Sequence, residues 1–348
     1  MYEMDNRTIH YHKEIRRLFD DPSQRGVFRI DEQTVGVTDG PLSKAILAAR
    51  PMYDFERIVF KPILGQPIAK ATFSAVMRAV GQDARRVAES PPEPGPRLAG
   101  RWPDAGYLYL QQRLYASDPW PIYALTHRVA NRTGWLKPLV DGLSSRLMTR
   151  LLHRCAPIHS SALAQLVNEA PDAHERRRAV TLYRRTARSM CITVACLVTN
   201  ALWLASARDA RERPRDCITE TLRLMPPAWM YHRNACQEFT AVDARIRETD
   251  DVLVIPLITQ RDPRHWPDAD AYEPDRWLGV SNPEASDHYL PFGHSHDRCW
   301  ARELVLMLAE HTIRQIAMQD HWTDSRQTSV QVPLKSLLCP TRVNVVAV

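Results

Sequence analysis

The seven cysteines of this 348-residue chain include no C-x-x-C pair, and their number is odd. A secreted disulfide framework is therefore not indicated, and neither is a cysteine set for an iron–sulfur cluster. The N-terminal stretch MYEMDNRTIHYHK is polar and charged, without the apolar core of a signal peptide or membrane anchor. We expect a reducing, cytoplasmic setting.

The chain also lacks any basic low-complexity run and any internal repeat. Its formal net charge is +6, but the lysine and arginine residues are scattered, which favours a solvated surface over a nucleic-acid-binding face. With 44% hydrophobic residues, a chain of this length can bury a large core. A globular protein without a nucleic-acid partner is the expected class.

One long hydrophobic run, from Ser189 to Ala207, allows two interpretations. It is long enough to span a membrane, but it contains serine, threonine and asparagine residues. Arginine-rich segments lie on both of its sides, so no charge asymmetry would orient it. A helix that is apolar all round can equally cross the core of a large soluble domain. We expect such a buried helix and no membrane partner.

The spacing of apolar residues is mostly helical up to residue 207 and changes to short strands and turns after Asp216. A proline-rich break at 90–96 is interpreted as a loop inside one domain spanning 1–348, because neither side looks self-sufficient. The sequence therefore predicts a mainly α fold with a minor β-sheet built from both ends of the chain. Helices are expected at 41–49, 72–89, 107–115, 136–152, 162–167, 177–207 and 300–317, with a short one around Glu220, and strands at 26–30, 34–38, 239–242, 252–255 and 342–348.

The segment LPFGHSHDRCWA places Cys299 between an irregular loop and the start of a predicted helix. Unpaired backbone N–H groups and the helix dipole at such a position lower a thiol pKa and favour the thiolate. A thiolate is a suitable axial ligand for haem iron. Two alternatives stay open: a buried structural cysteine, and a zinc site formed by His294, His296 and Cys299, for which no fourth ligand is evident.

Two further segments of the sequence carry arginine and glutamate residues that could form a cluster of ion pairs. Glu220 and Arg223 are three residues apart on a predicted helix, so their side chains can pair. Arg276 follows in YEPDRW and could join them, since a guanidinium can bind a carboxylate through two hydrogen bonds. A pair on a solvated helix face is the alternative.

In this order, E-x-x-R, P-P, P-x-R-W and F-G-x-x-x-x-x-C resemble the C-terminal half of the cytochrome P450 family. The resemblance covers Asp216 to Ala317 closely and the rest of the chain loosely. It implies a cytochrome P450-like haem-thiolate fold that binds haem b. It also implies that Cys299 is the proximal iron ligand and that Glu220, Arg223 and Arg276 form a structural cluster. The residues expected to contact the haem are Arg233, Phe292, Gly293, His296, Arg298 and Cys299.

The same resemblance identifies Ala195 to Thr199 on the hydrophobic helix as a degraded oxygen-binding motif, with Thr199 as its catalytic hydroxyl. Thr193 competes for the same place. Val198 stands where the family has a proton-carrying acid, and this departure puts ordinary oxygen activation in doubt. The 21 positions from Thr199 to Glu220 are also fewer than the family's usual spacing, which indicates a missing helix.

The function implied is that of a cytochrome P450-type monooxygenase, which oxidises a mostly apolar small molecule in bacterial secondary metabolism. Its electrons would come from a separate ferredoxin or flavin reductase, attracted by Arg298, Arg302 and Arg314. Two alternatives are a peroxide-driven oxidation or rearrangement on the haem, and a non-catalytic relative that activates a partner enzyme.

Overall fold

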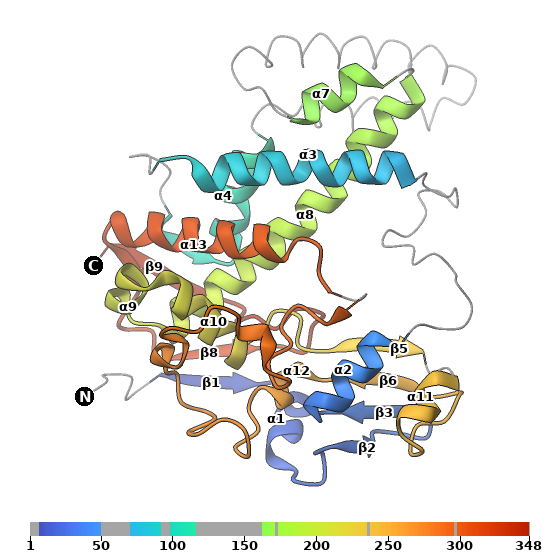
Figure 1. Cartoon of the computed structure of the whole chain (residues 1–348). Coiled ribbons are helices and arrows are strands. Elements are labelled where there is room, and N and C mark those ends of the chain that lie inside the picture. Colours follow the sequence, from blue (N-terminus) through green and yellow to red (C-terminus); the bar gives the residue numbers. More distant parts are fainter. Residues whose placement is uncertain are drawn as a thin grey trace, which may run out of the picture. The chain divides into compact units, whose positions relative to one another are not determined.

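The computed structural model describes residues 7–49, 70–91, 98–115, 162–170, 173–234, 237–295 and 298–347. The helix expected at 136–152 lies outside these residues. The described residues are mostly helical, with three small sheets (Figure 1). They form two compact units. The sheet unit takes in the described parts of Met1–Ile58, Pro91–Tyr107 and Ile192–Val348, and the helical unit those of Val59–Ser90 and Leu108–Cys191.

The largest sheet has the order β2-β3-β6-β5 (Figure 1). Strands β2 (Val27–Arg29) and β3 (Thr34–Val37) form an antiparallel hairpin. Strand β6 (Asp251–Val254) pairs in parallel with β3, and β5 (Tyr231–Asn234) pairs antiparallel with β6. Residues more than 200 positions apart therefore share one sheet. The predicted C-terminal strand belongs to a different sheet, in which β9 (Val343–Ala347) pairs with β4 (Gly100–Trp102) and β7 (His321–Thr323).

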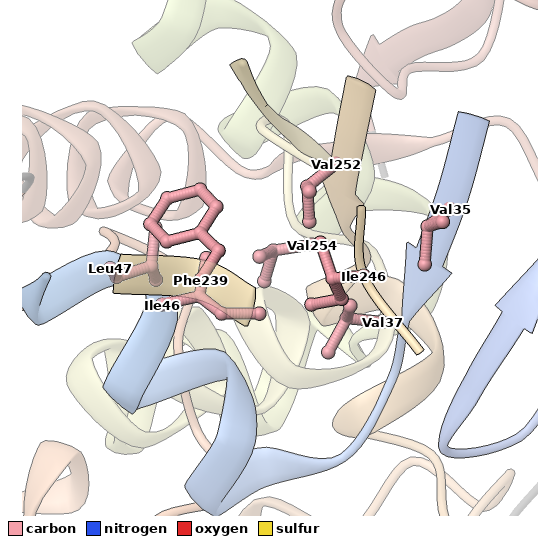
Figure 2. Packing of buried hydrophobic residues seen from close by; sticks show 8 residues of the cluster. All are labelled: Val35, Val37, Ile46, Leu47, Phe239, Ile246, Val252 and Val254. Carbon is pink, nitrogen blue, oxygen red and sulfur yellow. The ribbon is translucent and has the colours of Figure 1, made fainter. Parts of the chain in front are cut away.

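One face of this sheet packs against helix α2 (Gly40–Ala48), whose N-terminus is capped by Asp39 through a hydrogen bond from the Leu42 N–H. Figure 2 shows the shared core, in which side chains from the sheet, α2 and the segment between β5 and β6 point toward one another. Burying such aliphatic and aromatic side chains is the main stabilising term for this layer. The core consists of Val35, Val37, Ile46, Leu47, Phe239, Ile246, Val252 and Val254.

The strand predicted at 239–242 is wrong, because this segment belongs to helix α11 (Gln237–Val242). Its β-favouring composition is overridden by packing, since Phe239 inserts into the core beside Ile46 and Leu47 (Figure 2). A short helix presents this ring to the core while its neighbour Val242 stays exposed.

Arg29 on β2 and Asp250, just before β6, form a two-pronged ion pair with N–O distances of 2.8 and 2.7 Å. The Asp250 carboxylate also accepts the Arg247 N–H at 2.7 Å. The hydrogen bond from Arg29 lowers the pKa of Asp250. This pair ties the edge of the hairpin to the turn that leads into β6.

We expect Asp250→Asn to destabilise the protein at neutral pH and to matter less in acid. A folded-state pKa below the unfolded value contributes stability above about pH 4, and the contribution is lost as pH falls through the folded pKa. Urea unfolding of the native protein and the variant at a series of pH values measures this. The control is Glu248→Gln, an exposed carboxylate in the same turn. An Asp250→Asn effect that persists unchanged in acid would contradict the prediction.

The helical unit is organised around Asp83 on α3 (Lys70–Glu89), which is almost completely buried. Its carboxylate accepts hydrogen bonds from the Tyr183 hydroxyl at 2.7 Å and from the Ala162 N–H at 3.2 Å. Ala162 begins helix α7 (Ala162–Glu169), and Tyr183 lies on α8 (Ala173–Leu204). A buried carboxylate satisfied in this way fixes three helices relative to one another.

Helix α8 contains the long hydrophobic run. By length and composition alone, Arg178–Leu204 could cross a membrane, but 78% of its most apolar window is buried inside the structure. This burial agrees with the expectation of a core helix. One such helix is weak evidence for a membrane span.

Two short helices follow α8. Helix α9 (Ala207–Glu212) occupies the place where the spacing indicated a missing helix, so the connection is shortened rather than empty. Helix α10 (Pro214–Leu224) begins with a proline, and its C-cap Met225 comes directly before Pro226 and Pro227. The remaining elements are β1 (Thr8–Tyr11), α1 (Lys13–Asp20), β4 (Gly100–Trp102), α4 (Asp104–Tyr115), α12 (Pro256–Thr259), η2 (Pro274–Trp277), η3 (Pro283–Ala285), α13 (Arg302–Met318), β7 (His321–Thr323), β8 (Ser329–Val332) and β9 (Val343–Ala347).

Candidate functional site

Cys299 lies at the end of a tight loop, three residues before α13 begins. Its N–H donates to the Phe292 carbonyl at 2.8 Å, and its own carbonyl accepts the Arg302 N–H at 3.3 Å. Phe292 is buried, and Gly293 has φ +72°, a conformation that glycine adopts without strain. These contacts fold the backbone back on itself and hold Cys299 at the head of the helix. We call residues 290–301 the cysteine loop.

The Cys299 side chain is accessible to solvent, yet neighbouring protein atoms crowd its sulfur. This desolvation raises the pKa of the thiol, although the Ala301 N–H and the charge of Arg302 act in the opposite direction. The lowering of the thiol pKa predicted from the sequence is therefore wrong for the protein without a bound cofactor. The Ala301 N–H and the charge of Arg302 lower the pKa too little to offset the loss of solvent around the sulfur.

Tyr231 on β5 supports the cysteine loop, a role that no local sequence pattern indicated. Its hydroxyl donates to the Leu290 carbonyl at 3.0 Å and accepts the Gly293 N–H. Burial raises its pKa well above the usual tyrosine range. A tyrosine two residues before the expected haem-contacting Arg233 carries no sequence signal for this contact, because Tyr231 and the cysteine loop are about 60 positions apart.

We expect Tyr231→Phe to destabilise the protein by about 1 kcal/mol, since it removes a buried hydrogen bond and leaves the Leu290 carbonyl with only the longer bond from the Gly293 N–H, at 3.2 Å. The loop should also open more often, which increases the rate at which a thiol reagent alkylates Cys299. Urea unfolding and timed alkylation measure the two effects. Tyr289→Phe is the control, because the Tyr289 hydroxyl donates to Thr219 on α10 rather than bridging the loop. Equal alkylation rates in all three proteins would rule out this role for Tyr231.

Glu220 and Arg223 on α10 form an ion pair with no solvent exposure. The guanidinium donates to both carboxylate oxygens, at 2.9 and 2.8 Å. Glu220 also accepts hydrogen bonds from the Trp277 indole and the Glu273 backbone N–H, both at 2.9 Å. The remaining Arg223 donors reach the carbonyls of Gln260, Ala269 and Ala271 at 2.6 to 3.0 Å. The pair is thus fully hydrogen-bonded, and it fixes the segment 260–277.

Arg276 lies at the edge of this cluster. Its Nε is 3.5 Å from the Glu220 carboxylate and makes no hydrogen bond there. Its stronger contacts are with Glu273 at 2.7 Å and with the Asp268 carbonyl at 3.0 Å. The structure therefore brings the three predicted cluster residues together, with Arg276 bound more closely to Glu273 than to Glu220.

Gln260 connects the ion pair to the cysteine loop. Its buried amide donates to the carbonyls of Leu222 and Arg223, at 2.8 and 3.1 Å. Its side-chain oxygen accepts the Leu290 N–H at 2.8 Å. A chain of hydrogen bonds therefore runs from the Glu220–Arg223 pair through Gln260 to the first residue of the loop that presents Cys299.

Of the three cationic side chains expected to contact the haem, the structure describes Arg233 and Arg298, and each makes contacts within the chain. Arg233 lies half-buried on β5 and donates to its neighbour's carbonyl at 2.6 Å. Arg298 is paired with Glu284, which also binds Arg302 at 2.7 Å. His296 lies outside the described residues.

Thr199 is fully buried in α8, and its hydroxyl donates to the Ala195 carbonyl one turn earlier, at 2.6 Å. The structure does not bring it to an accessible surface. Thr193, on the same helix, is half-buried. Because a helix rotates about 100° per residue, two threonines six positions apart present different faces.

The zinc alternative gains no support from the described residues, among which no group of three histidine, cysteine, aspartate or glutamate side chains could hold a metal ion. A pocket of about 430 Å³ does lie beside the cysteine loop. Phe292 and Arg298 are the predicted site residues in its lining, and its other walls come from α10, α13 and the segment 277–289. Cys299 is not in that lining, so the pocket is not where a ligand bound to this sulfur would lie.

A haem group fits the donor chemistry of the loop. Cys299 is exposed and lies three residues before a helix start, and its N–H is held by the carbonyl of the buried residue Phe292. Arg233 is a nearby cation on β5, the strand that also carries Tyr231. The residues that would hold the group are thus Cys299, Phe292, Gly293 and Arg233, with Arg298 available only by leaving Glu284.

Comparisons with known proteins agree with this site. The family description "Cytochrome P450" matches residues 214–299. Cyclooctatin synthase of Streptomyces melanosporofaciens is 34% identical over 106 residues, which is 30% of this chain and 23% of that protein. Thromboxane-A synthase of Mus musculus is 30% identical over 120 residues, 34% of this chain and 22% of that protein. The chain thus matches about a quarter of the length of these relatives.

Solved structures match the fold over nearly the whole chain. The hydroxylase HmtN has a TM-score of 0.57 at 13% identity and covers 97% of both chains. The open cytochrome P450 EryK from S. erythraea has a TM-score of 0.55 at 16% identity, covering 96% of this chain and 94% of that one. At such identities the likeness concerns the fold alone.

A mainly helical fold with a buried E-x-x-R pair and a cysteine presented at a helix start defines a haem-thiolate class of protein. Residues 214–299 match the cytochrome P450 family, and the chain shares the fold of solved cytochrome P450 structures over nearly its whole length. This family match implies a haem iron cofactor.

Proposed function

We propose that this protein is a haem-thiolate oxidoreductase in which Cys299 is the proximal ligand of haem b. The observation that carries the proposal is the accessible sulfur of Cys299 at the head of α13, on a loop held by Tyr231 and Gln260. When bound, the haem supplies the oxidation chemistry, while the protein supplies binding, orientation and exclusion of water.

Each described residue of the site has a limited task in this proposal. Cys299 would hold the haem iron through its sulfur, which requires loss of the thiol proton, and the raised pKa of this thiol opposes that loss in the protein without the cofactor. Phe292 and Gly293 keep the loop closed behind the sulfur. Arg233 and Arg298, with His296, contact the anionic edge of the cofactor.

The proposed substrate is a mostly apolar small molecule of bacterial secondary metabolism, oxidised in the cytoplasm. The names of similar proteins support this class. One relative is called cyclooctatin synthase, and a solved neighbour is an EryK mutant in complex with erythromycin B. A hydroxylation or a related oxidation is the proposed reaction.

The electron donor would be a separate ferredoxin or flavin reductase. The structure limits the role proposed for the arginines around the loop, because they are paired within the chain. Arg298 and Arg302 share Glu284, and Arg314 binds Glu310 at 2.6 Å. Paired charges attract an acidic partner less strongly than isolated ones.

A second candidate function, a peroxide-driven oxidation or a rearrangement, is favoured by the position of Thr199. Its hydroxyl is buried and already bonded to the Ala195 carbonyl, and Val198 cannot carry a proton. Monooxygenation needs protons delivered to bound dioxygen, whereas these alternatives do not need that delivery from the protein.

The test is the absorption spectrum of the purified protein, reduced under carbon monoxide and then titrated with candidate substrates. A red-shifted, thiolate-type Soret band and a substrate-induced spin-state change are expected. Failure to bind haem on purification and on reconstitution would overturn the proposal and support a non-catalytic activator of another enzyme. Turnover with peroxide and no reductase separates the second candidate from the first.

A further inference from the structure

Two cysteines far apart in the sequence meet where α8 approaches the segment between β8 and β9. Cys196 lies on α8, and Cys339 lies 143 residues later. The Cys339 sulfur lies 3.9 Å from the Cys196 carbonyl oxygen and 3.4 Å from the Pro340 carbonyl oxygen, and the two thiols shift each other's pKa. The exposed fractions of Cys196 and Cys339 are only 6% and 8%. No role for this pair follows from the haem-thiolate function.

The backbone around the pair is held by hydrogen bonds on both sides. The Asn200 amide on α8 donates to the carbonyls of Met225 and Leu338, at 2.7 and 3.0 Å. The Leu338 N–H donates to the Pro227 carbonyl at 2.9 Å. Because Leu338 is fixed to α8 in this way, the adjacent Cys339 stays next to Cys196 rather than meeting it by chance motion.

The two thiols are electrostatically unequal. The hydrogen bond from Cys339 and the positive charge of Lys335 lower the pKa of Cys196, against the effect of burial. The pKa of Cys339 is raised, first by its hydrogen bond with Cys196 and then by burial. A thiolate is the reacting form of cysteine, so Cys196 is the better nucleophile and Cys339 the resolving partner.

We propose that Cys196 and Cys339 form a dithiol–disulfide site that hydrogen peroxide oxidises. The Cys196 thiolate attacks one peroxide oxygen, the O–O bond breaks, and the released hydroxide takes up a proton to become water. The resulting sulfenic acid is attacked by the Cys339 sulfur, which forms the S–S bond and releases a second water. Two electrons pass from the two sulfurs to the peroxide, and a thiol reductant reverses the change.

The disulfide would bind the segment 333–342 covalently to α8. Asn200 already links the same two segments through its hydrogen bond to the Leu338 carbonyl, so the disulfide would add a covalent bond beside an existing contact. Oxidation would therefore reduce the opening of this segment, which amide hydrogen exchange of the peptides around Leu338 measures.

The test treats the folded full-length protein with graded hydrogen peroxide, blocks the remaining thiols with N-ethylmaleimide, and digests the protein without reductant. The expected product is a peptide pair joined through Cys196 and Cys339 that loses two hydrogen atoms of mass and separates on reduction. In Cys339→Ser, dimedone should trap sulfenic acid on Cys196. Cys217→Ala should keep the cross-link, since Cys217 is a buried thiol whose neighbour is the Tyr272 hydroxyl.

Recovery of both cysteines as N-ethylmaleimide adducts, at a peroxide dose that oxidises glutathione in the same tube, would overturn the proposal. So would a cross-link that appears only after unfolding in urea. The native protein gives both readouts by itself, so the test survives if a variant does not fold. Neither readout depends on bound haem. The test therefore gives its answer whether or not the proposed haem-thiolate function is correct.

Discussion

We expect the replacement of Cys299 by alanine to abolish the thiolate-type Soret band of the reduced protein under carbon monoxide and, with it, haem-dependent turnover. Alanine has no donor atom, so the complete loss of the spectral signature is expected rather than a graded change. The side chain is exposed, alanine keeps the backbone N–H bond to the Phe292 carbonyl, and only the contact of the sulfur with the Ala301 N–H is lost. The free energy of unfolding should therefore change by no more than about 0.5 kcal/mol.

Cys217→Ala is the matched control for this experiment. Cys217 is a buried cysteine on α10 whose thiol pKa is raised to about 12, mainly by burial, so it is a poor metal ligand. We expect the control to keep the thiolate-type band. A band that persists in Cys299→Ala, or disappears in both variants, would remove Cys299 from the proposed ligand position.

The second large expected effect is a loss of protein stability in Glu220→Ala. The substitution leaves the Arg223 guanidinium buried without its counter-charge and leaves the Trp277 indole and Glu273 N–H without an acceptor. Removing one partner of a buried ion pair costs about 3–5 kcal/mol. Because a typical domain is stable by only about 5–15 kcal/mol, we expect low soluble yield and a much lower urea midpoint.

Its control is Glu212→Ala on the neighbouring helix α9. Glu212 pairs with Arg208 at 3.1 Å, but both side chains are exposed, at 54% and 82%. Such a pair contributes about 0.5 kcal/mol or less. Equal losses of stability in the two variants would mean that burial does not set the strength of the Glu220–Arg223 pair.

Removing both partners should not restore stability. An apolar pair can replace a buried ion pair when nothing else depends on it. Here the carbonyls of Gln260, Ala269 and Ala271 also rely on Arg223. We therefore expect Glu220→Met combined with Arg223→Met to stay destabilised, as urea unfolding would show. Recovery to the native midpoint would contradict this network.

The sequence predicted α10 and α13 well, because both carry apolar residues at helical spacing between proline or loop signals. It also predicted that Glu220, Arg223 and Arg276 lie near one another. That inference came from the order of motifs typical of a family, since the spacing alone left a solvated pair open. The sequence also predicted that Cys299 lies before a helix, because an irregular loop leads to it and apolar residues at helical spacing follow it.

Other features depended on contacts that no local pattern records. Residues 239–242 have a strand-like composition, yet Phe239 packs into the core as part of α11 (Figure 2). Tyr231 and Gln260 support the cysteine loop from segments 59 and 30 positions away. Thr199 matched a motif position, but its burial was decided by how α8 packs.

By itself, the sequence determined which residues can do chemistry and which elements carry them, because periodicity, turn residues and motif order are local properties of the chain. Only the tertiary structure decided which of those residues are accessible and what charge they favour. Burial and long-range hydrogen bonds set both properties: they raise the pKa of the Cys299 thiol, hide the Thr199 hydroxyl and bring Cys339 to Cys196. These contacts form only when distant segments pack together.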